Sequence, residues 1–320
     1  MGGSPEEVAI GRIQAAYRAT LPGLDALPAR RPAHAAVAGV WILGPGPSPG
    51  AATYVLRSRA LDAGTVEAFR RETDLVDRLR GVLPLRLPDP LPADDGRRCV
   101  PDAETGALWT IHAALPGRIV RPWQALHLAP DGERRALVVA LRALHDATRG
   151  RLGPPDPAWI VRDVRARLAR AGSMLSARSA SRVRAAVDRV EASGRDLDPD
   201  RLAFVHGDFH WGNLLVADDG RVDGLLDLDW CRVSDPLEDL AYSAMMLVRN
   251  CDGGPWRLDD LDRVVAWYGP GPLDTGRFRD LFLLYAFFDA VLFREATGLP
   301  DRERFVRLQL DLIARLADCD

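Results

Sequence analysis

The sequence contains no lysine, so all 42 of its basic residues are arginine. Its four cysteines (Cys99, Cys231, Cys251 and Cys319) are scattered, which excludes a disulfide scaffold and a cysteine-based metal site. The sequence has no signal peptide and no apolar run long enough to span a bilayer, and we therefore expect a cytoplasmic protein. The formal net charge of −3 predicts no binding to nucleic acid or to a membrane surface. Nothing in the sequence indicates an oligomeric state.

The 320 residues are enough for one large domain or for two lobes that each bury a core. Residues 1–115 mix strand and helix patterns. A capping box at Ser4–Glu7 predicts a short helix, and further patterns predict strands at 36–43, 53–57 and 109–111 and a helix at 65–80.

A hinge is expected near Leu115-Pro116-Gly117, and the chain from 116 to 320 is mainly helical. Helical patterns occur at 133–147, 161–175, 180–192, 237–249, 258–268, 277–297 and 301–317. We predict an α+β fold with two lobes, a small mixed lobe with an antiparallel sheet at 1–115 and a helical lobe at 116–320.

The strongest chemical signal lies where a strand and a hairpin interrupt the second half. The apolar run 202–205 predicts a buried strand that leads into His206-Gly207-Asp208, and Asn213 follows Asp208 by five residues. Asp218-Asp219-Gly220 predicts a hairpin turn, and the strand after it delivers Asp227. An Asp, an Asn five residues later and a second Asp are the set that phosphoryl-transfer enzymes use to accept a hydroxyl proton and to hold Mg²⁺ against a nucleotide.

This pattern resembles the aminoglycoside phosphotransferase and choline kinase superfamily over about residues 36–245. The matching pieces are His206-Gly207-Asp208, Asn213, Asp227, Asp235-Pro236 and Asp239-Leu240-Ala241. The resemblance implies a fold like that of protein kinases, with a nucleotide-binding lobe followed by a lobe that carries the catalytic loop and the substrate site. It also implies transfer of the γ-phosphate of ATP or GTP to a hydroxyl of a small molecule.

Within that resemblance Asp208 is the expected general base, and Asn213 and Asp227 are the expected Mg²⁺ ligands. Asp229 competes with Asp227, because both carboxylates lie on one strand face, but the spacing from Asp227 to Asp235 matches the family. The resemblance gives His206 a supporting role behind the loop. His210 and Trp211 receive no definite role, and Asp235 and Asp239 are expected to cap and anchor the following helix.

A second argument comes from the first lobe. Glu72 lies amid the apolar half of the helix predicted at 65–80, where a carboxylate is costly unless it is paired. The expected partner is Arg57, at the end of the preceding strand. This pair corresponds to the Lys–Glu pair of kinases, with arginine as the cation, and Arg57 and Glu72 are therefore expected to help bind the nucleotide.

The glycine-rich run 44–50 is a weak candidate for a phosphate-binding loop, because its three prolines carry no N–H group. We interpret it as the connection between two strands. The loop over the phosphates is then expected earlier, around Pro32–Ala36.

Two other classes of function remain open. His206, Asp208 and His210 alternate in a way that a zinc or other transition-metal hydrolase could use, although this hypothesis leaves Asn213 and Asp227 without a task. The chain could also be a catalytically inactive kinase-like binding module.

The acceptor is the least defined part of the prediction. An antibiotic of the aminoglycoside or macrolide type is preferred, and the strand that contains Arg57 resembles those of macrolide kinases. A metabolic alcohol such as choline, homoserine or a sugar is the alternative. Acidic residues that could attract a cationic acceptor are Asp252, Asp259, Asp260, Asp262, Asp289 and Glu295. Apolar residues that could line a cleft include Met245, Met246, Trp256, Trp267, Tyr285, Phe287, Phe288 and Phe293.

Overall fold

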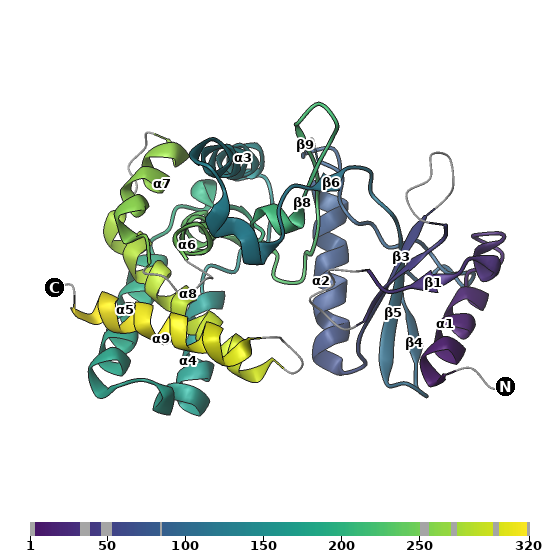
Figure 1. Ribbon diagram of the computed structural model, residues 1–320, viewed down its shortest axis with the longest axis horizontal. Coiled ribbons are helices and arrows are strands. Elements are labelled where there is room, and N and C mark those ends of the chain that lie inside the picture. The colour runs from purple at the N-terminus through teal and green to yellow at the C-terminus, as the bar shows by residue number, and fades with distance from the viewer. Residues whose placement is uncertain are drawn as a thin grey trace. The chain divides into compact units, whose positions relative to one another are not determined.

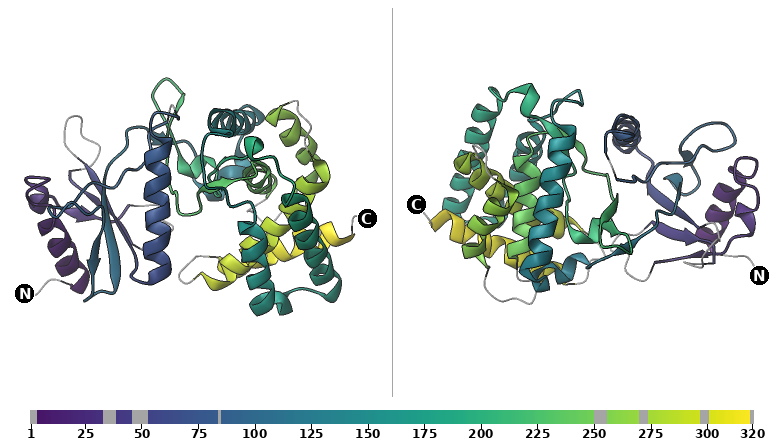
Figure 2. Two further views of the ribbon diagram at one scale, coloured as in Figure 1. Left: turned by 180° about the vertical axis from the view of Figure 1, so that it is seen from behind. Right: turned by 90° about the horizontal axis from the view of Figure 1, so that it is seen from above.

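The computed structural model divides the chain into two compact units, which Figures 1 and 2 show from three sides. The first unit comprises residues 1–80, 84–118 and 215–229, and the second comprises 81–83, 119–214 and 230–320. The structure describes residues 4–32, 39–45, 53–83, 85–249, 256–269, 274–296 and 301–318. Among these residues no helix is long and apolar enough to cross a membrane.

The first unit is built on a five-stranded antiparallel sheet with the strand order β1-β2-β3-β5-β4. Its strands are β1 (Ala29–Arg30), β2 (Val40–Leu43), β3 (Tyr54–Ala60), β4 (Val100–Asp102) and β5 (Ala107–Ala113). The described part of the predicted strand 36–43 begins at Gly39, and β2 itself begins at Val40. Central strand β3 pairs with both β2 and β5, and Arg57 lies opposite Val40 on one side and Thr110 on the other.

Two helices lie on opposite faces of this sheet (Figures 1 and 2): α1 (Pro5–Ala15) and α2 (Ala63–Leu79). The predicted capping box of α1 is confirmed, since Ser4 Oγ accepts from the Glu7 backbone at 3.2 Å and Glu7 Oε2 accepts from the Ser4 backbone at 2.7 Å. Apolar side chains of α1 pack in one core with Leu56 and other residues of the sheet. Because side chains alternate along a strand, Arg57 and Arg59 belong to the opposite face, the face of α2.

The predicted hairpin is confirmed as β8 (Leu214–Val216) and β9 (Val222–Leu225), with the short β6 (Arg118–Ile119) beside β8. Gly220 makes the turn at a φ of 84°, a backbone conformation that suits glycine. The hairpin ends two residues before Asp227.

The second unit is mainly helical, and the strands β7 (Ala203–Val205) and β10 (Arg232–Ser234) form a small antiparallel pair within it. Each predicted helix is present, with ends displaced by up to four residues, and 258–260 forms a 3-10 turn before its helix. The helices are α3 (Asp131–Thr148), α4 (Trp159–Ala171), α5 (Ala177–Gly194), α6 (Leu237–Val248), α7 (Leu261–Tyr268), α8 (Thr275–Glu295) and α9 (Arg302–Asp318). The predicted α+β class is confirmed.

Candidate active site

The predicted catalytic loop leaves the end of β7. All three residues of β7 are buried, and the chain then turns at Gly207 with a φ of 82°. A Cβ at Gly207 would lie 2.7 Å from Trp230 Cβ and 2.8 Å from the Trp230 carbonyl oxygen, which is closer than real contacts allow. Only glycine fits this turn, and the turn places Asp208 directly after a buried strand.

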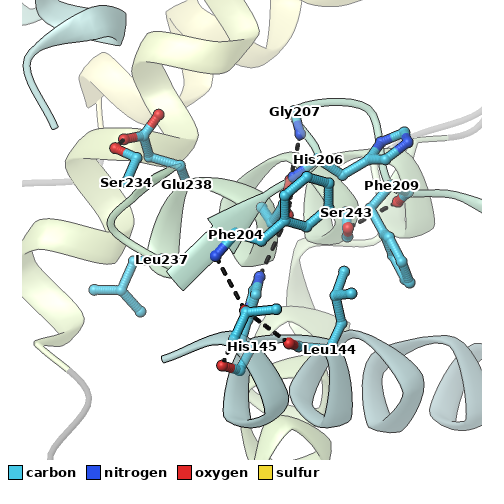
Figure 3. A network of polar contacts seen from close by, with 12 residues as sticks. Leu144, His145, Phe204, His206, Gly207, Phe209, Ser234, Leu237, Glu238 and Ser243 are labelled. Carbon is cyan, nitrogen blue, oxygen red and sulfur yellow. Dashed lines mark hydrogen bonds and ion pairs between the residues drawn. The ribbon is translucent and has the colours of Figure 1, made fainter. Parts of the chain in front are cut away.

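A buried carboxylate on α6 holds the loop in place. Asp239 accepts hydrogen bonds from the backbone N–H groups of His206 and Gly207, each at 2.7 Å. The Nε2 of His145 lies 3.3 Å from Asp239 Oδ2, and its Nδ1 lies 2.7 Å from the Tyr268 hydroxyl. Figure 3 shows His145 on α3 together with His206 and Gly207 of the loop. Burial raises the pKa of Asp239, but the hydrogen bond from His145 and the nearby His206 lower it by more than burial raises it. The net pKa is below its usual value, so the carboxylate is ionised.

The Asp208 carboxylate lies among three hydrogen-bond donors. His210 Nε2 is 3.2 Å from Asp208 Oδ1, Asn213 Nδ2 is 2.9 Å from Oδ2, and the Tyr242 hydroxyl also bonds to Asp208. Burial raises the pKa of Asp208, but the charge and hydrogen bond of His210, together with His206 and Tyr242, bring it below its usual value. The side chain is 21% exposed. The result is an ionised carboxylate that remains accessible, as proton transfer from a substrate hydroxyl requires.

Asn213 stands at the end of a 3-10 turn that follows the loop. Its amide nitrogen donates to the Asp208 carbonyl oxygen as well as to the carboxylate, both at 2.9 Å. The five-residue spacing therefore closes the loop on itself. Because the amide nitrogen is used in this way, the amide oxygen is the atom of Asn213 suited to a hard cation.

The two histidines of the loop are engaged in local hydrogen bonds. His206 Nδ1 accepts from the Asp208 backbone at 3.2 Å, and His210 Nδ1 accepts from the Gly212 backbone at 3.0 Å. Both ring nitrogens of His210 are thus used, since its Nε2 faces Asp208. In the described ranges no three His, Cys, Asp or Glu side chains are grouped so that they could hold a metal ion. The metallohydrolase hypothesis finds no support there.

In the first unit, Asp227 has a φ of 58°, in the left-handed region that few residues other than glycine adopt. Such strained backbone is concentrated at functional sites. Arg57 Nη2 lies 3.3 Å from Asp227 Oδ1 and 3.2 Å from Asp229 Oδ1. Burial lowers the pKa of Arg57, but the charges of Asp229, Asp227 and Glu72 raise it by more than burial lowers it. The net pKa is above its usual value, so Arg57 keeps its charge.

The predicted pairing of Glu72 with Arg57 is wrong. Glu72 is buried, as expected, but the cation beside it is Arg59, whose Nη1 lies 2.7 Å from Glu72 Oε2. Arg59 also pairs with Asp229. Residues 57 and 59 face the same side of β3, so the face that Glu72 contacts was predicted correctly. The contacting arginine lies two residues further along the strand than predicted. Arg57 instead connects β3 to the residues after β9.

Two residues of these networks were not found from the sequence. Arg57 and Arg59 are separated by Ser58, so they lie on the same face of the strand. This two-residue alternation could have indicated Arg59 from the sequence. Tyr242 follows Asp239 by three residues on α6, which places both on one helix face, but nothing local indicates that its hydroxyl reaches Asp208. The expected phosphate-covering loop falls mostly on residues 33–38, and most of the run 44–50 falls on 46–52; both stretches lie outside the described residues.

Comparison with known proteins agrees with this arrangement. The model of the phosphotransferase enzyme family matches residues 28–281, a range that contains every predicted site residue. Comparison with curated protein sequences gives no match.

Solved structures share the fold at low sequence identity. The GDP complex of aminoglycoside 2'-phosphotransferase-IIIa has a TM-score of 0.63 and 13% identity, with 96% of this chain and 98% of that chain covered. A microcompartment-associated aminopropanol kinase has a TM-score of 0.67 and 17% identity, with coverages of 97% and 96%. An amicoumacin kinase in complex with AMP-PNP and Ca²⁺ has a TM-score of 0.65 and 13% identity, with coverages of 97% and 94%. The predicted two-lobed, kinase-like fold is thus confirmed.

Proposed function

Because this chain belongs to the phosphotransferase enzyme family, we propose that it transfers the γ-phosphate of ATP or GTP to a hydroxyl of a small molecule in a Mg²⁺-dependent reaction. The observation that carries this proposal is the Asp208 carboxylate, ionised, partly exposed and oriented by His210 and Asn213 on a loop that Asp239 fixes. The preferred acceptor is an antibiotic of the aminoglycoside or macrolide type.

In this reaction Asp208 accepts the proton of the acceptor hydroxyl as the oxygen attacks the γ-phosphorus. Its low pKa suits a reaction in which the phosphoryl group largely leaves before the new bond forms, since the hydroxyl proton then transfers late. His210 and Asn213 hold the two carboxylate oxygens, so that the carboxylate keeps one orientation. They act as positioning residues.

We assign the metal ligands to Asn213 and Asp227. Magnesium prefers hard oxygen ligands, usually from one or two protein residues together with phosphates and water, and an amide oxygen and a carboxylate meet this requirement. When bound, Mg²⁺ neutralises charge on the phosphates. The Asp227 side chain is 34% exposed, and Arg57 already balances its charge in the structure.

Residues 1–115 are proposed to bind the nucleotide, and residues 116–320 to carry the catalytic loop and the acceptor site. Arg57 has the charge and the planar donor group that suit a phosphate. A bound phosphate would compete with the neighbouring acids for its guanidinium group. Glu72 acts through Arg59, which it orients beside Asp229. The GDP and AMP-PNP complexes of the structural neighbours support a nucleotide donor of either base.

Three of the six candidate acceptor-binding acids are paired with arginine. Asp289 pairs with Arg249 at 3.2 Å, and Glu295 pairs with Arg170 at 2.8 Å. Asp260 lies 2.9 Å from Arg134, and Asp252 lies outside the described residues. Within the preferred antibiotic class, these pairings favour an acceptor with few positive charges, such as a macrolide, over a polycationic aminoglycoside. Most of the apolar candidates belong to the core, since Met245, Met246, Trp256, Tyr285, Phe287 and Phe288 are buried.

A metabolic alcohol is the second candidate acceptor. The observation that favours it is the likeness to an aminopropanol kinase, which has the highest TM-score among the neighbours described above. A small amino alcohol carries one positive charge and needs no acidic cluster.

The test is a screen of nucleotide consumption with ATP and GTP, each with Mg²⁺, against aminoglycosides, macrolides, choline, homoserine, aminopropanol and sugars. Mass spectrometry of the acceptor identifies the phosphorylated product. We expect one class to stimulate nucleoside diphosphate release, and chelation of the metal to abolish it. Nucleotide binding without turnover on any acceptor would instead support an inactive binding module.

A further inference from the structure

A cavity of about 230 Å³ lies in the second unit, away from the residues assigned to catalysis. The described residues that line it include four arginines, Arg142, Arg149, Arg201 and Arg277, against two aspartates, Asp235 and Asp274. Pockets for drug-sized ligands usually have about 300–1,000 Å³. The size and the charge of this cavity therefore suit a compact anion.

Both aspartates are engaged at the starts of helices. Asp235 accepts from the Leu237 backbone at 3.0 Å at the start of α6, and Asp274 accepts from the Arg277 backbone at 2.9 Å at the start of α8. The two helix N-termini at this cavity are thus already capped by carboxylates, and an anion in the cavity would be attracted by the arginines.

Arg277 gives the cavity a rigid, buried cation. Its side chain is 5% exposed, with Nε bonded to Asp235 at 2.5 Å and Nη1 bonded to the Val190 carbonyl oxygen at 2.8 Å. Its Nη2 has no hydrogen-bond partner among the described residues, which is costly for a buried donor of a charged group. Arg277 therefore has hydrogen-bonding capacity that the protein itself does not use.

Arg142 and Arg149 share a single carboxylate. Asp146 accepts from Arg142 Nε at 2.7 Å and from Arg149 Nη2 at 3.1 Å. Each guanidinium has five N–H groups, so most of these donors are not used by Asp146. Both side chains are about one-third exposed, at 33% and 32%, and Arg142 Nη1 also lies 3.5 Å from the Tyr268 carbonyl oxygen.

We propose that this cavity is a binding site for a phosphate-type oxyanion, held by the partly exposed Arg142 and Arg149 at its rim and attracted by the charge of the buried Arg277. Arginine suits such a ligand, because its planar donor group bonds to two oxygens at once. The ligand is either free phosphate or the phosphate group of a monoester whose organic part stays outside the cavity.

The site also contacts the network that supports the catalytic loop. Tyr268 lines the cavity, and its hydroxyl bonds to His145, which in turn reaches Asp239. An anion bound here would therefore lie two side chains away from the residue that fixes the loop.

The test is calorimetric titration of the full chain, without nucleotide, with sodium phosphate and separately with phenyl phosphate. Ionic strength is held constant with sodium chloride, because bulk salt screens exposed charge. The variants are Arg142→Gln and Arg149→Gln, and Arg135→Gln on the exposed surface of α3 is the matched control. Thermal unfolding of each variant confirms folding, and Arg277 is left intact because it is buried.

We expect saturable binding that either rim substitution weakens by about tenfold or more, the loss of a charged hydrogen bond, while Arg135→Gln leaves it unchanged. Tighter binding of phosphate than of phenyl phosphate identifies the free ion as the ligand, and the reverse order identifies a monoester. Absence of saturable binding, or equal binding by wild type and both rim variants, would overturn the proposal, since any phosphate bound would then lie elsewhere.

Discussion

The pairing of Glu72 with Arg59 is open to a quantitative test by a double-mutant cycle. The substitutions are Glu72→Gln, Arg59→Gln and the two together. A parallel cycle combines Glu72→Gln with Arg57→Gln. Glutamine keeps much of the side-chain volume and removes the charge, so the coupling energy of each cycle reports mainly the ion pair.

The expected magnitude follows from distance and burial. Arg59 Nη1 and Glu72 Oε2 lie 2.7 Å apart, and the side chains are 20% and 5% exposed. Two unit charges about 4 Å apart attract by roughly 4 kcal/mol at an effective dielectric constant of about 20. Desolvation offsets part of this attraction, and exposed pairs contribute only about 0.2–1 kcal/mol. For this mostly buried pair we expect a coupling of about 2 kcal/mol.

The assay is urea unfolding followed by tryptophan fluorescence, to which the Trp41–Trp109 pair in the core of the first unit contributes. The cycle of Arg57 with Glu72 should give less than half the coupling, because Arg57 bonds to Asp227 and Asp229. A coupling with Arg57 that equals or exceeds the coupling with Arg59 would refute the assignment and restore the pairing expected from the sequence.

Three further outcomes are expected. Asp227→Asn should weaken Mg²⁺-dependent nucleotide binding more than Asp229→Asn, and the opposite order in a fluorescent-nucleotide titration would move the metal ligand to Asp229. Burial, with Arg57 and Arg59 nearby, lowers the pKa of His112 to about 3. Below about pH 6.5 His112 binds a proton in the unfolded chain but not in the folded chain. The free energy of unfolding therefore falls as the pH falls through that range. Between pH 7.5 and 5 the wild type should therefore lose about 2 kcal/mol more unfolding free energy than His112→Gln, and equal losses in urea titrations would contradict the shift. Gly207→Ala should lower both turnover and melting temperature more than Gly220→Ala, because both positions have positive φ but only Gly207 is crowded; equal effects would show that the loop can adjust.

Much of the fold could be predicted because its signals are local. The capping box at Ser4 and the turn at Gly220 depend on residues close in sequence, and both formed as expected. The same holds for the loop from His206 to Asn213, because the five-residue spacing between Asp208 and Asn213 brings these two side chains together. The helix ends differ by a few residues partly because the chain forms 3-10 turns at 172–174 after α4 and at 258–260 before α7, which helical periodicity does not distinguish.

The parts that were missed depend on contacts between distant segments. The choice between Arg57 and Arg59 as the partner of Glu72 requires the position of α2 along β3, which alternation alone does not give. Asp239 was expected to anchor its own helix, yet it accepts from a loop more than thirty residues earlier in the chain. The bond from Tyr242 to Asp208 likewise arises only when α6 packs against that loop.

The central claim is that Asp208 takes the proton of the acceptor hydroxyl. The most direct measurement compares turnover and nucleotide affinity of Asp208→Asn with those of the wild type, on the acceptor that the screen identifies. Loss of a general base should lower turnover by about 10²-fold or more, while the nucleotide dissociation constant stays within about threefold. Turnover close to that of the wild type, with folding intact, would contradict the mechanism and remove Asp208 from the reaction.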